Sequence, residues 1–445
     1  MLRRFISTVG LIALLVVFTA STVQAATINV ATGMVVVAAD GQCSLIEAVV
    51  NANTDAATHA DCPAGSGADT ISLANGSTYT LAAVDNTVGS LGGNGLPAIT
   101  SSITINGNGA TITRGNGAPN FRIFYVDTGG NLTLNSATVS KGDPGAYAGG
   151  GIYSNSATLT IANATLSNNT AGGVGGGLHS VGSTLTVNNS TVTNNSGYGI
   201  AVTFGSATVA DSTFSNNSDD GLVVHGNPIL TVANSTFSNN GGSGLAVLSG
   251  TADITDSIFS GNHDTYNGGG LMIGVAGSTP VVTVANSTFA SNSAANMGGA
   301  IANSGTLTIN NSTISGNSVS NISITGFGGG IANGGNLTLN SVALSNNTAG
   351  ASGGGIYNWA GAVTINDSVL SGNVASGDYG GGGLYTNGYN TVTINNSTIS
   401  GNLATAGGVG RGGGGIYVAD SNSAVEITNS TLSGNQSASD GGGIF

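Results

Sequence analysis

The sequence predicts an all-β solenoid, a parallel β-helix in which each coil of the chain stacks on the one before. Three observations predict this fold: a short unit recurs along the chain, apolar and polar residues alternate within it, and glycine and asparagine separate the alternating segments. Glycine makes up 76 of 445 residues, and a chain this rich in glycine would be disordered if its hydrophobic residues were scattered at random. Because 40% of the residues are hydrophobic and recur in register, a packed core is the better interpretation.

The recurring unit places an apolar-Thr-apolar segment, such as Leu-Thr-Ile at 159–161, before an Asn-Ser-Thr-like step and one more apolar residue. A glycine-rich step that ends in an apolar residue, as at 149–152, precedes most copies. The single apolar residues are Val139, Leu166, Val192, Phe214, Phe237, Phe259, Phe289, Ile314, Leu344, Leu370, Ile399 and Leu432. Their spacing runs from 22 residues between Val192 and Phe214 to 33 between Ile399 and Leu432, too short for the four antiparallel strands of a propeller blade.

Alternation with a period of two predicts strands, and no unit holds a helical pattern that could form a crossover. Strands this short are stable only when they stack, which pairs them in parallel and buries one face continuously. We therefore expect about twelve coils over residues 101–445, which would form a rod roughly 55 Å long. The spacing varies mainly before the glycine step, as at 319–326 and 404–410. Longer loops should therefore lie along one edge of the rod, where a binding function would be found.

One column of asparagines also follows from aligning the units. Asn163, Asn189, Asn234, Asn286, Asn311, Asn396 and Asn429 occupy equivalent positions, and Asp211, Asp256 and Asp367 replace asparagine in other units. Stacked asparagine side chains can donate hydrogen bonds from coil to coil. We expect this column to form the buried ladder of the solenoid and to be inaccessible to glycosylation, although many of its members read as acceptor sites.

The N-terminal segment carries two features, an export signal and a cap. Arg3 and Arg4, an apolar run over residues 11–18 and a small-residue site at 23–25 indicate a signal peptide over residues 1–25. Residues 26–100 should form the N-terminal cap and the first strands. Within this cap, Ser44 and Glu47 form a capping box, and the apolar spacing that follows predicts a short helix over 44–53. A solenoid needs its first coil covered, and this helix is suited to that role.

The chain has two cysteines, Cys43 and Cys62, on either side of the predicted helix. Export would place them where a disulfide persists, so we predict that they pair and hold the cap, two free thiols being the alternative. Two thiols alone make a poor metal site, since zinc takes four ligands. At the other end the chain stops within a unit, at 441–445. A longer chain or another molecule is expected to close this end.

The charge balance excludes some classes of partner. The chain has six basic and 19 acidic residues, and removal of Arg3 and Arg4 with the signal leaves four basic ones. Four cations cannot neutralise enough phosphates for nucleic-acid binding. Apart from the signal, which is too short to span a bilayer, no stretch is apolar enough for a transmembrane anchor.

Two family resemblances follow from these motifs. Residues 43–49 (Cys-Ser-Leu-Ile-Glu-Ala-Val) and 51–53 (Asn-Ala-Asn) resemble the CSLREA-type N-terminal segment of bacterial secreted β-helix proteins, with Ile46 where that pattern has arginine. Residues 298–301 match the GGA[ILV] motif of polymorphic outer membrane protein repeats, and the four Phe-x-x-Asn steps that begin at Phe214, Phe237, Phe259 and Phe289 match its FxxN motif. Elsewhere glycine replaces the alanine, and isoleucine, leucine or valine replaces the phenylalanine. The resemblance implies a right-handed β-helix, pectin-lyase-like in fold, at or beyond the outer membrane.

A catalytic site would require carboxylates or cations gathered on one face. The candidates for catalytic residues are Asp219 and Asp220, which replace glycines of the repeat and are expected in an exposed turn, with Asp211 before them and His225 after. Asp211 is equally explained as a member of the asparagine column, and His225 as a surface or turn residue. No tandem calcium-binding nonapeptide is present, so no metal or cofactor is expected. The isolated Asp264 and Asp378 are interpreted as solvated loop charges, loose calcium binding being the alternative.

The predicted binding residues are aromatic. Tyr357, Tyr385 and Tyr417 follow the glycine step in successive units, and Trp359 lies nearby. Alternation places this column outside the core, either as a stack that stiffens the coils or as a platform for sugars or a partner protein. We expect a secreted or cell-surface β-helix of structural or adhesive type, with surface glycans or proteins as partners. The alternative is a polysaccharide lyase or glycoside hydrolase that uses the aspartates.

Overall fold

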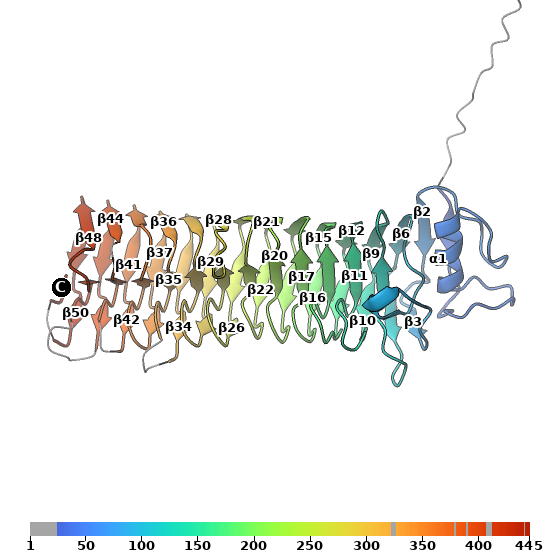
Figure 1. Ribbon diagram of the computed structural model, residues 1–445, viewed down its shortest axis with the longest axis horizontal. Helices are drawn as coiled ribbons and strands as arrows, with labels where there is room; N and C mark the ends of the chain where they lie inside the picture. Colours follow the sequence, from blue (N-terminus) through green and yellow to red (C-terminus); the bar gives the residue numbers. More distant parts are fainter. Residues whose placement is uncertain (1–24, 322–325, 378–379, 389, 406–411, 440) are drawn as a thin grey trace, which may run out of the picture.

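The structure of this chain, a computed structural model, is one elongated rod (Figure 1). It describes residues 25–321, 326–377, 380–388, 390–405, 412–439 and 441–445, so the expected signal peptide lies outside the described residues except for Ala25. The N-terminal cap and the last coil lie at opposite ends of the rod, and strands of successive coils lie side by side between them (Figure 1). No helix in this described part of the chain has the length and hydropathy to cross a membrane.

Four parallel sheets run along the rod, with 15, 14, 12 and 7 strands, and we number them sheets 1 to 4. Among the described strands, only β4 (Asn86–Thr87) and β5 (Gly93–Asn94) pair antiparallel. The sheets run from β1 (Thr27–Asn29) to β48 (Ala424–Thr428), from β3 (Thr78–Leu81) to β49 (Thr431–Ser433), from β8 (Phe124–Val126) to β47 (Ile416–Val418) and from β26 (His263–Asp264) to β50 (Gln436–Ser437). This topology confirms the parallel β-helix.

Sheet 3 positions the candidate site. Between β8 and β47 its strands are β11 (Ile152–Asn155), β14 (Leu178–Val181), β17 (Ile200–Thr203), β20 (Leu222–His225), β23 (Leu245–Val247), β27 (Leu271–Ile273), β31 (Ile301–Asn303), β35 (Ile331–Asn333), β39 (Ile356–Asn358) and β43 (Leu384–Thr386). The glycine step precedes most of these strands, as the repeat predicts, and Asp219 and Asp220 replace two of its glycines before β20.

One coil shows how the alternation builds the core. β21 (Ile229–Ala233) lies in sheet 1, β22 (Thr236–Ser238) in sheet 2 and β23 in sheet 3. Leu230 and Val232 from β21 and Phe237 from β22 point inward and are buried. Burial of each such side chain contributes roughly 1.5–3 kcal/mol. The same positions stack from coil to coil, and the rings of Phe214, Phe237, Phe259 and Phe289 form a continuous stack with centroids 4.8, 4.9 and 4.6 Å apart.

The buried asparagine ladder occupies a different column from the predicted one. It consists of the asparagines that end the Phe-x-x-Asn-like steps: Asn169, Asn195, Asn217, Asn240, Asn262, Asn292, Asn317, Asn347, Asn373, Asn402 and Asn435. Each amide donates to the side-chain oxygen of the next asparagine and to a carbonyl of the previous coil, as Asn240 does to Asn262 (2.9 Å) and Phe214 (3.1 Å). The ladder therefore satisfies backbone and side-chain groups inside the turn before the glycine step.

The predicted column at Asn163, Asn189 and its equivalents is exposed, so the expectation of a buried ladder there is wrong. These residues are the first of the two that connect sheets 1 and 2, and they adopt positive φ, 51° at Asn163 and 44° at Asn189. Asparagine tolerates this left-handed conformation, which directs its side chain to solvent. Hydrogen bonds along the column do form, as from Asn189 Nδ2 to Asn163 Oδ1 at 2.7 Å, but the side chains remain accessible.

The N-terminal cap agrees with the sequence prediction. Helix α1 (Leu45–Thr54) begins with the expected capping box, in which Ser44 N donates to Glu47 Oε2 (2.9 Å) and Glu47 N donates to Ser44 Oγ (3.3 Å). Cys43 and Cys62 form the predicted disulfide, with their Cα atoms 4.6 Å apart. The helix contacts β1, β2 (Asp69–Ser72) and β6 (Ser102–Asn106), so it covers the first edge of sheet 1.

Candidate functional site

Three successive coils of the rod are shorter than those on either side. Successive ladder asparagines between Asn195 and Asn262 are 22, 23 and 22 residues apart, whereas 26 residues precede this stretch and 30 follow it. The connections into sheet 3 are short in these coils, at 194–199, 216–221 and 239–244, but longer on either side, at 168–177 and 261–270. The longer connections therefore flank a stretch in which the side chains of Val174, Tyr198, Leu248 and Met272 pack over the outer face of sheet 3.

The outward column of sheet 3 has small residues in the same region. In register, this column reads Tyr125, Tyr153, His179, Ala201, Val223, Ala246, Met272, Ala302, Ala332, Tyr357, Tyr385 and Tyr417. Aromatic rings fill both ends of the column, while Ala201, Val223 and Ala246 leave its middle shallow. Short loops and small side chains thus coincide, and we call the resulting depression the hollow.

The hollow has two compartments that share Tyr198. The apolar compartment is a cavity of about 420 Å³ lined by Val174, Tyr198, Val223, His225, Leu248, Ser249, Val275 and Ser278. The acidic compartment has about 460 Å³ and is lined by Tyr198, Asp219, Asp220, Gly241, Gly242, Asp264, Thr265, Tyr266, Asn267 and Met272. Both volumes suit a small ligand or a segment of a longer one.

Backbone groups hold the carboxylates of the acidic compartment in place. Ser243 N donates to Asp220 Oδ1 (2.7 Å) and Ser243 Oγ donates to Asp264 Oδ2 (3.2 Å), so one serine joins two carboxylates. Asp220 N donates to Asp219 Oδ1 at 3.1 Å. A Cβ atom at Gly242 would lie 2.5 Å from Asp220 Oδ1 and 2.7 Å from Asp219 Oδ1, so a side chain there would displace both carboxylates.

Burial and mutual repulsion alter the protonation of these carboxylates. Asp220 is only 8% exposed, and burial, followed by the charges of Asp219 and Asp264, raises its pKa to about 8. Burial likewise raises the pKa of Asp219. The pKa of Tyr198 is raised by burial and by the charges of the same three aspartates. Asp220 therefore holds a proton near neutral pH beside a carboxylate that is more exposed.

The structure places the candidate residues around Asp219 and Asp220 differently from what the sequence predicts. Asp219 and Asp220 were expected in an exposed turn, but Asp220 is buried because the next coil packs over it through Ser243. Asp211 lies in the exposed turn between sheets 1 and 2, where Asn234 donates to it, and it lines neither compartment. His225 enters the apolar compartment. Asp264, read from the sequence as a solvated loop charge, is buried and joins Asp220 through Ser243.

A hydrogen-bonded chain connects the floor of the hollow to the neighbouring coils. Thr203 Oγ1 lies 2.9 Å from His179 Nε2 and 2.8 Å from His225 Nε2. Burial, with the charges of His225 and Arg122, lowers the pKa of His179 to about 4, so its ring is neutral at neutral pH. These hydrogen bonds could not be predicted from the sequence, because the three residues lie in three different coils.

The predicted tyrosine column points away from the main core, but it is buried. Tyr357, Tyr385 and Tyr417 stack with centroids 5.0 and 5.3 Å apart and are only 8%, 7% and 8% exposed. Each ring covers the faces of its neighbours, and Phe327 and Trp359 pack against the stack. The stack, one of the two roles expected for this column, is therefore present, and its rings leave little surface exposed. Trp359 remains half-buried.

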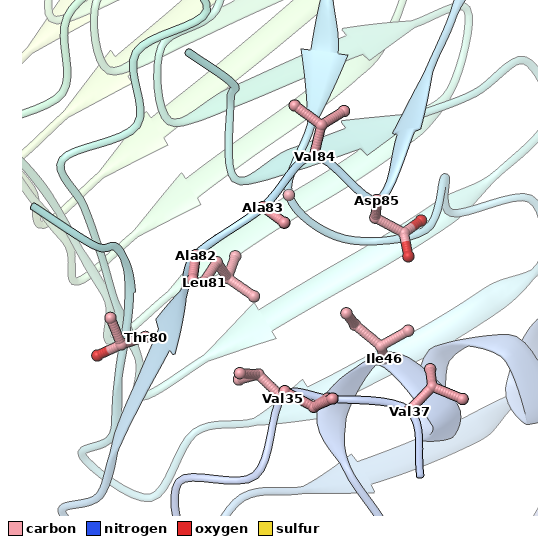
Figure 2. A pocket seen from close by; sticks show the side chains of 11 residues that line it. Val35, Val37, Ile46, Thr80, Leu81, Ala82, Ala83, Val84 and Asp85 are labelled. Atoms are coloured by element: carbon pink, nitrogen blue, oxygen red, sulfur yellow. The ribbon is translucent and has the colours of Figure 1, made fainter. Parts of the chain in front are cut away.

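A further cavity lies beside the cap. About 350 Å³ is enclosed by Val35, Val36, Val37 and Ile46 on the cap side and by Thr80, Leu81, Ala82, Ala83, Val84, Asp85 and Gly95 opposite. Figure 2 shows the cap valines and Ile46 from α1 facing the segment that continues from β3. Its lining is almost wholly aliphatic, and Asp85 is its only charged residue.

Two family models match parts of the chain. Residues 203–383 match a model described as a right handed beta helix region, which agrees with the sheet topology and establishes the right-handed parallel β-helix. Residues 82–272 match the model of the periplasmic copper-binding protein NosD, in line with a location outside the cytoplasm. Each match covers less than half of the chain. The resemblance to CSLREA-type segments and polymorphic outer membrane repeats is not tested by these matches and stays a prediction.

The residues present do not fit a copper site. Among the described residues, no group of three or more histidine, cysteine, aspartate or glutamate side chains is placed to hold a metal ion. Both cysteines are consumed by the disulfide. Asp264 Oδ1 accepts from the backbone of Tyr266 and Asn267, which explains this carboxylate without a metal. Asp378 lies outside the described residues.

Solved structures with a similar shape belong to proteins of different kinds. Pectate lyase Pel9A is 18% identical, over 61% of this chain and 70% of that one, with a TM-score of 0.41. The periplasmic alginate epimerase AlgG is 10% identical, over 82% and 77%, with a TM-score of 0.40. PfbA, a surface adhesin of Streptococcus pneumoniae, is 11% identical, over 82% and 86%, with a TM-score of 0.39. No curated protein matches this chain.

Proposed function

We propose that this chain is an exported β-helix protein of structural or adhesive type that binds glycan chains in the hollow over sheet 3. One observation carries the proposal: three short coils coincide with a run of small outward residues on sheet 3, and the side chains that pack over these residues line two adjacent cavities. A groove across stacked coils suits a linear polymer, because equivalent positions recur at about 4.8 Å. Secretion and placement on the outer surface belong to the same proposal.

The test is glycan binding by the chain from Ala25 onward. Tyr198 lines both compartments, so Tyr198→Ala should weaken binding at least tenfold, as loss of a stacking aromatic residue does. Tyr147→Ala is the matched control, since Tyr147 is exposed and lines neither compartment. No binding across a broad glycan panel, or equal losses in the two variants, would refute this function.

A second candidate function is glycoside hydrolysis in the acidic compartment. The observation that favours it is the contrast between Asp220, whose pKa is raised to about 8, and the more exposed Asp219. Such a pair suits a general acid and a base or nucleophile. Release of reducing ends from neutral polysaccharides, abolished in Asp220→Asn but unchanged in the distant Asp85→Asn, would support it. Glycan binding without release of reducing ends would rule out hydrolysis and support the structural or adhesive function.

A further inference from the structure

The hollow is unsuited to anionic ligands. The carboxylates of Asp219 and Asp264 line the acidic compartment beside Asp220, which holds a proton near neutral pH, and no lysine or arginine lines either compartment. The described cations are engaged elsewhere: Arg114 pairs with Asp143 at 3.5 Å, Arg122 is fully buried, and Lys141 contacts Asn116. A uronate or phosphate group would therefore meet like charge without compensation. Neutral sugar hydroxyls, in contrast, can donate hydrogen bonds to these carboxylates.

The apolar compartment combines aliphatic walls with one polar ring. Val174, Val223, Leu248 and Val275 supply the walls, and His225 is the only titratable group among them apart from the shared Tyr198. The two serines of the lining already engage the backbone: Ser249 Oγ accepts from Asn227 N, and Ser278 Oγ contacts both N and O of Val275. A ligand group that fits here needs an apolar part and one hydrogen-bonding part.

The chain through Thr203 restricts what His225 can offer. The threonine hydroxyl has one proton, so it donates to the Nε2 of one histidine and accepts from the Nε2 of the other. The two rings therefore carry opposite tautomers. The Nδ1 of His225 has no hydrogen-bond partner among the described residues and remains for a ligand. If Thr203 donates to Nε2 of His225, Nδ1 carries the ring proton and can donate to a carbonyl oxygen of the ligand. If Thr203 accepts from this Nε2, Nδ1 can accept from an amide N–H.

We propose that the hollow selects neutral glycans that carry 2-acetamido groups, with the acetamido group in the apolar compartment against His225 and sugar hydroxyls at the carboxylates. The acetamido methyl matches the aliphatic walls, and its amide supplies both a carbonyl and an N–H, so it satisfies either tautomer of His225. A 6-deoxy sugar supplies the methyl without the amide, and an unsubstituted hexose supplies neither. This inference rests on the proposed glycan binding and names its ligand class.

The experiment compares four oligosaccharides of equal length by titration calorimetry with the chain from Ala25 onward. A chitooligosaccharide should bind about tenfold more tightly than a cellooligosaccharide or a rhamnose oligomer, and an oligogalacturonate should bind weakest. His225→Phe should reduce the preference for the chitooligosaccharide to less than threefold, while His263→Phe, whose side chain is exposed on sheet 4 and lines neither compartment, should leave it unchanged. Nitrogen NMR shifts of the His225 ring should change on titration with the chitooligosaccharide and, in Thr203→Val, should show mixed tautomers without ligand.

The outcomes separate this inference from the function on which it rests. If no oligosaccharide binds, the proposed function fails. If oligogalacturonate or cellooligosaccharide binds as tightly as the chitooligosaccharide, or if His225→Phe keeps the preference, glycan binding stands and the acetamido specificity is refuted. Purified peptidoglycan strands form an additional arm. Their acetamido groups alternate with lactyl carboxylates, so weaker binding than to chitooligosaccharides would point to chitin-like ligands, and tighter binding would contradict the predicted exclusion of anions.

Discussion

Replacement of Asn240 by alanine should destabilise the rod locally, because this residue sits in the middle of the buried asparagine ladder. Its side-chain amide donates to Phe214 O (3.1 Å) and to Asn262 Oδ1 (2.9 Å). Its side-chain oxygen accepts from both N (3.1 Å) and Nδ2 (3.0 Å) of Asn217. All four hydrogen bonds are lost in the variant, and the site is only 1% exposed.

The cost follows from the groups that are left without partners. Asn262 Oδ1 still accepts a hydrogen bond from the backbone N–H of residue 240, and Asn217 Nδ2 still donates one to Val192 O. The backbone N–H of Asn217 and the carbonyl oxygen of Phe214 lose the hydrogen bonds that they make with the Asn240 side chain. An unsatisfied buried polar group costs about 1–3 kcal/mol, so we expect a loss of about 3 kcal/mol for this part of the rod.

Hydrogen exchange measures this loss better than global unfolding, because a solenoid opens coil by coil and is not strictly two-state. Amides of the coils around Asn217 and Asn262 should exchange roughly a hundredfold faster in Asn240→Ala. Asn234→Gly is the control: Asn234 is exposed at φ 48° and makes one side-chain bond, to Asp211, so its loss should be within about 0.5 kcal/mol. Equal exchange rates in the two variants would show that the ladder does not stabilise the coils.

Three further predictions follow from buried groups. Because the folded state raises the pKa of Asp220 to about 8, the neutral form of this residue favours folding. The stability that it contributes is complete below about pH 4 and is lost as the pH rises through 8, so the melting temperature of the wild type should fall over this range and that of Asp220→Asn should fall much less. Parallel melting curves for the two proteins would contradict this pKa. Tyr385→Thr should lower the local stability of its coil by about 3 kcal/mol, measured by hydrogen exchange, and leave glycan binding unchanged, whereas weaker binding at unchanged stability would show that the column is a contact surface. Phe237→Ala leaves a gap in the phenylalanine stack and should cost about 3–5 kcal/mol of local stability by the same hydrogen-exchange measurement, and a loss below about 1 kcal/mol would mean that the neighbouring rings close the gap.

The candidate site was only partly predictable. Asp219 and Asp220 stood out because they replace glycines of the repeat, and both line the acidic compartment. Their partner Asp264 was noticed only as an isolated loop aspartate, and the shared Tyr198 was not noticed, because both lie in neighbouring coils. His225 was noticed, but its connection through Thr203 to His179 appears only when coils 22 and 24 residues apart are stacked. The tyrosine column was placed on the correct face, but ring stacking buries it.

The sequence by itself determined the fold, the cap and the disulfide, because each depends on local or strictly periodic signals. Alternation with a period of two selects strands, a recurring unit forces stacking, and the Ser44–Glu47 capping box acts within one helical turn. The tertiary structure decided which asparagine column is buried and where the site lies. The sign of φ at a turn residue such as Asn163 and the depth left by Ala201 or Ala246 depend on the coils above and below, and a period in the sequence does not encode those contacts.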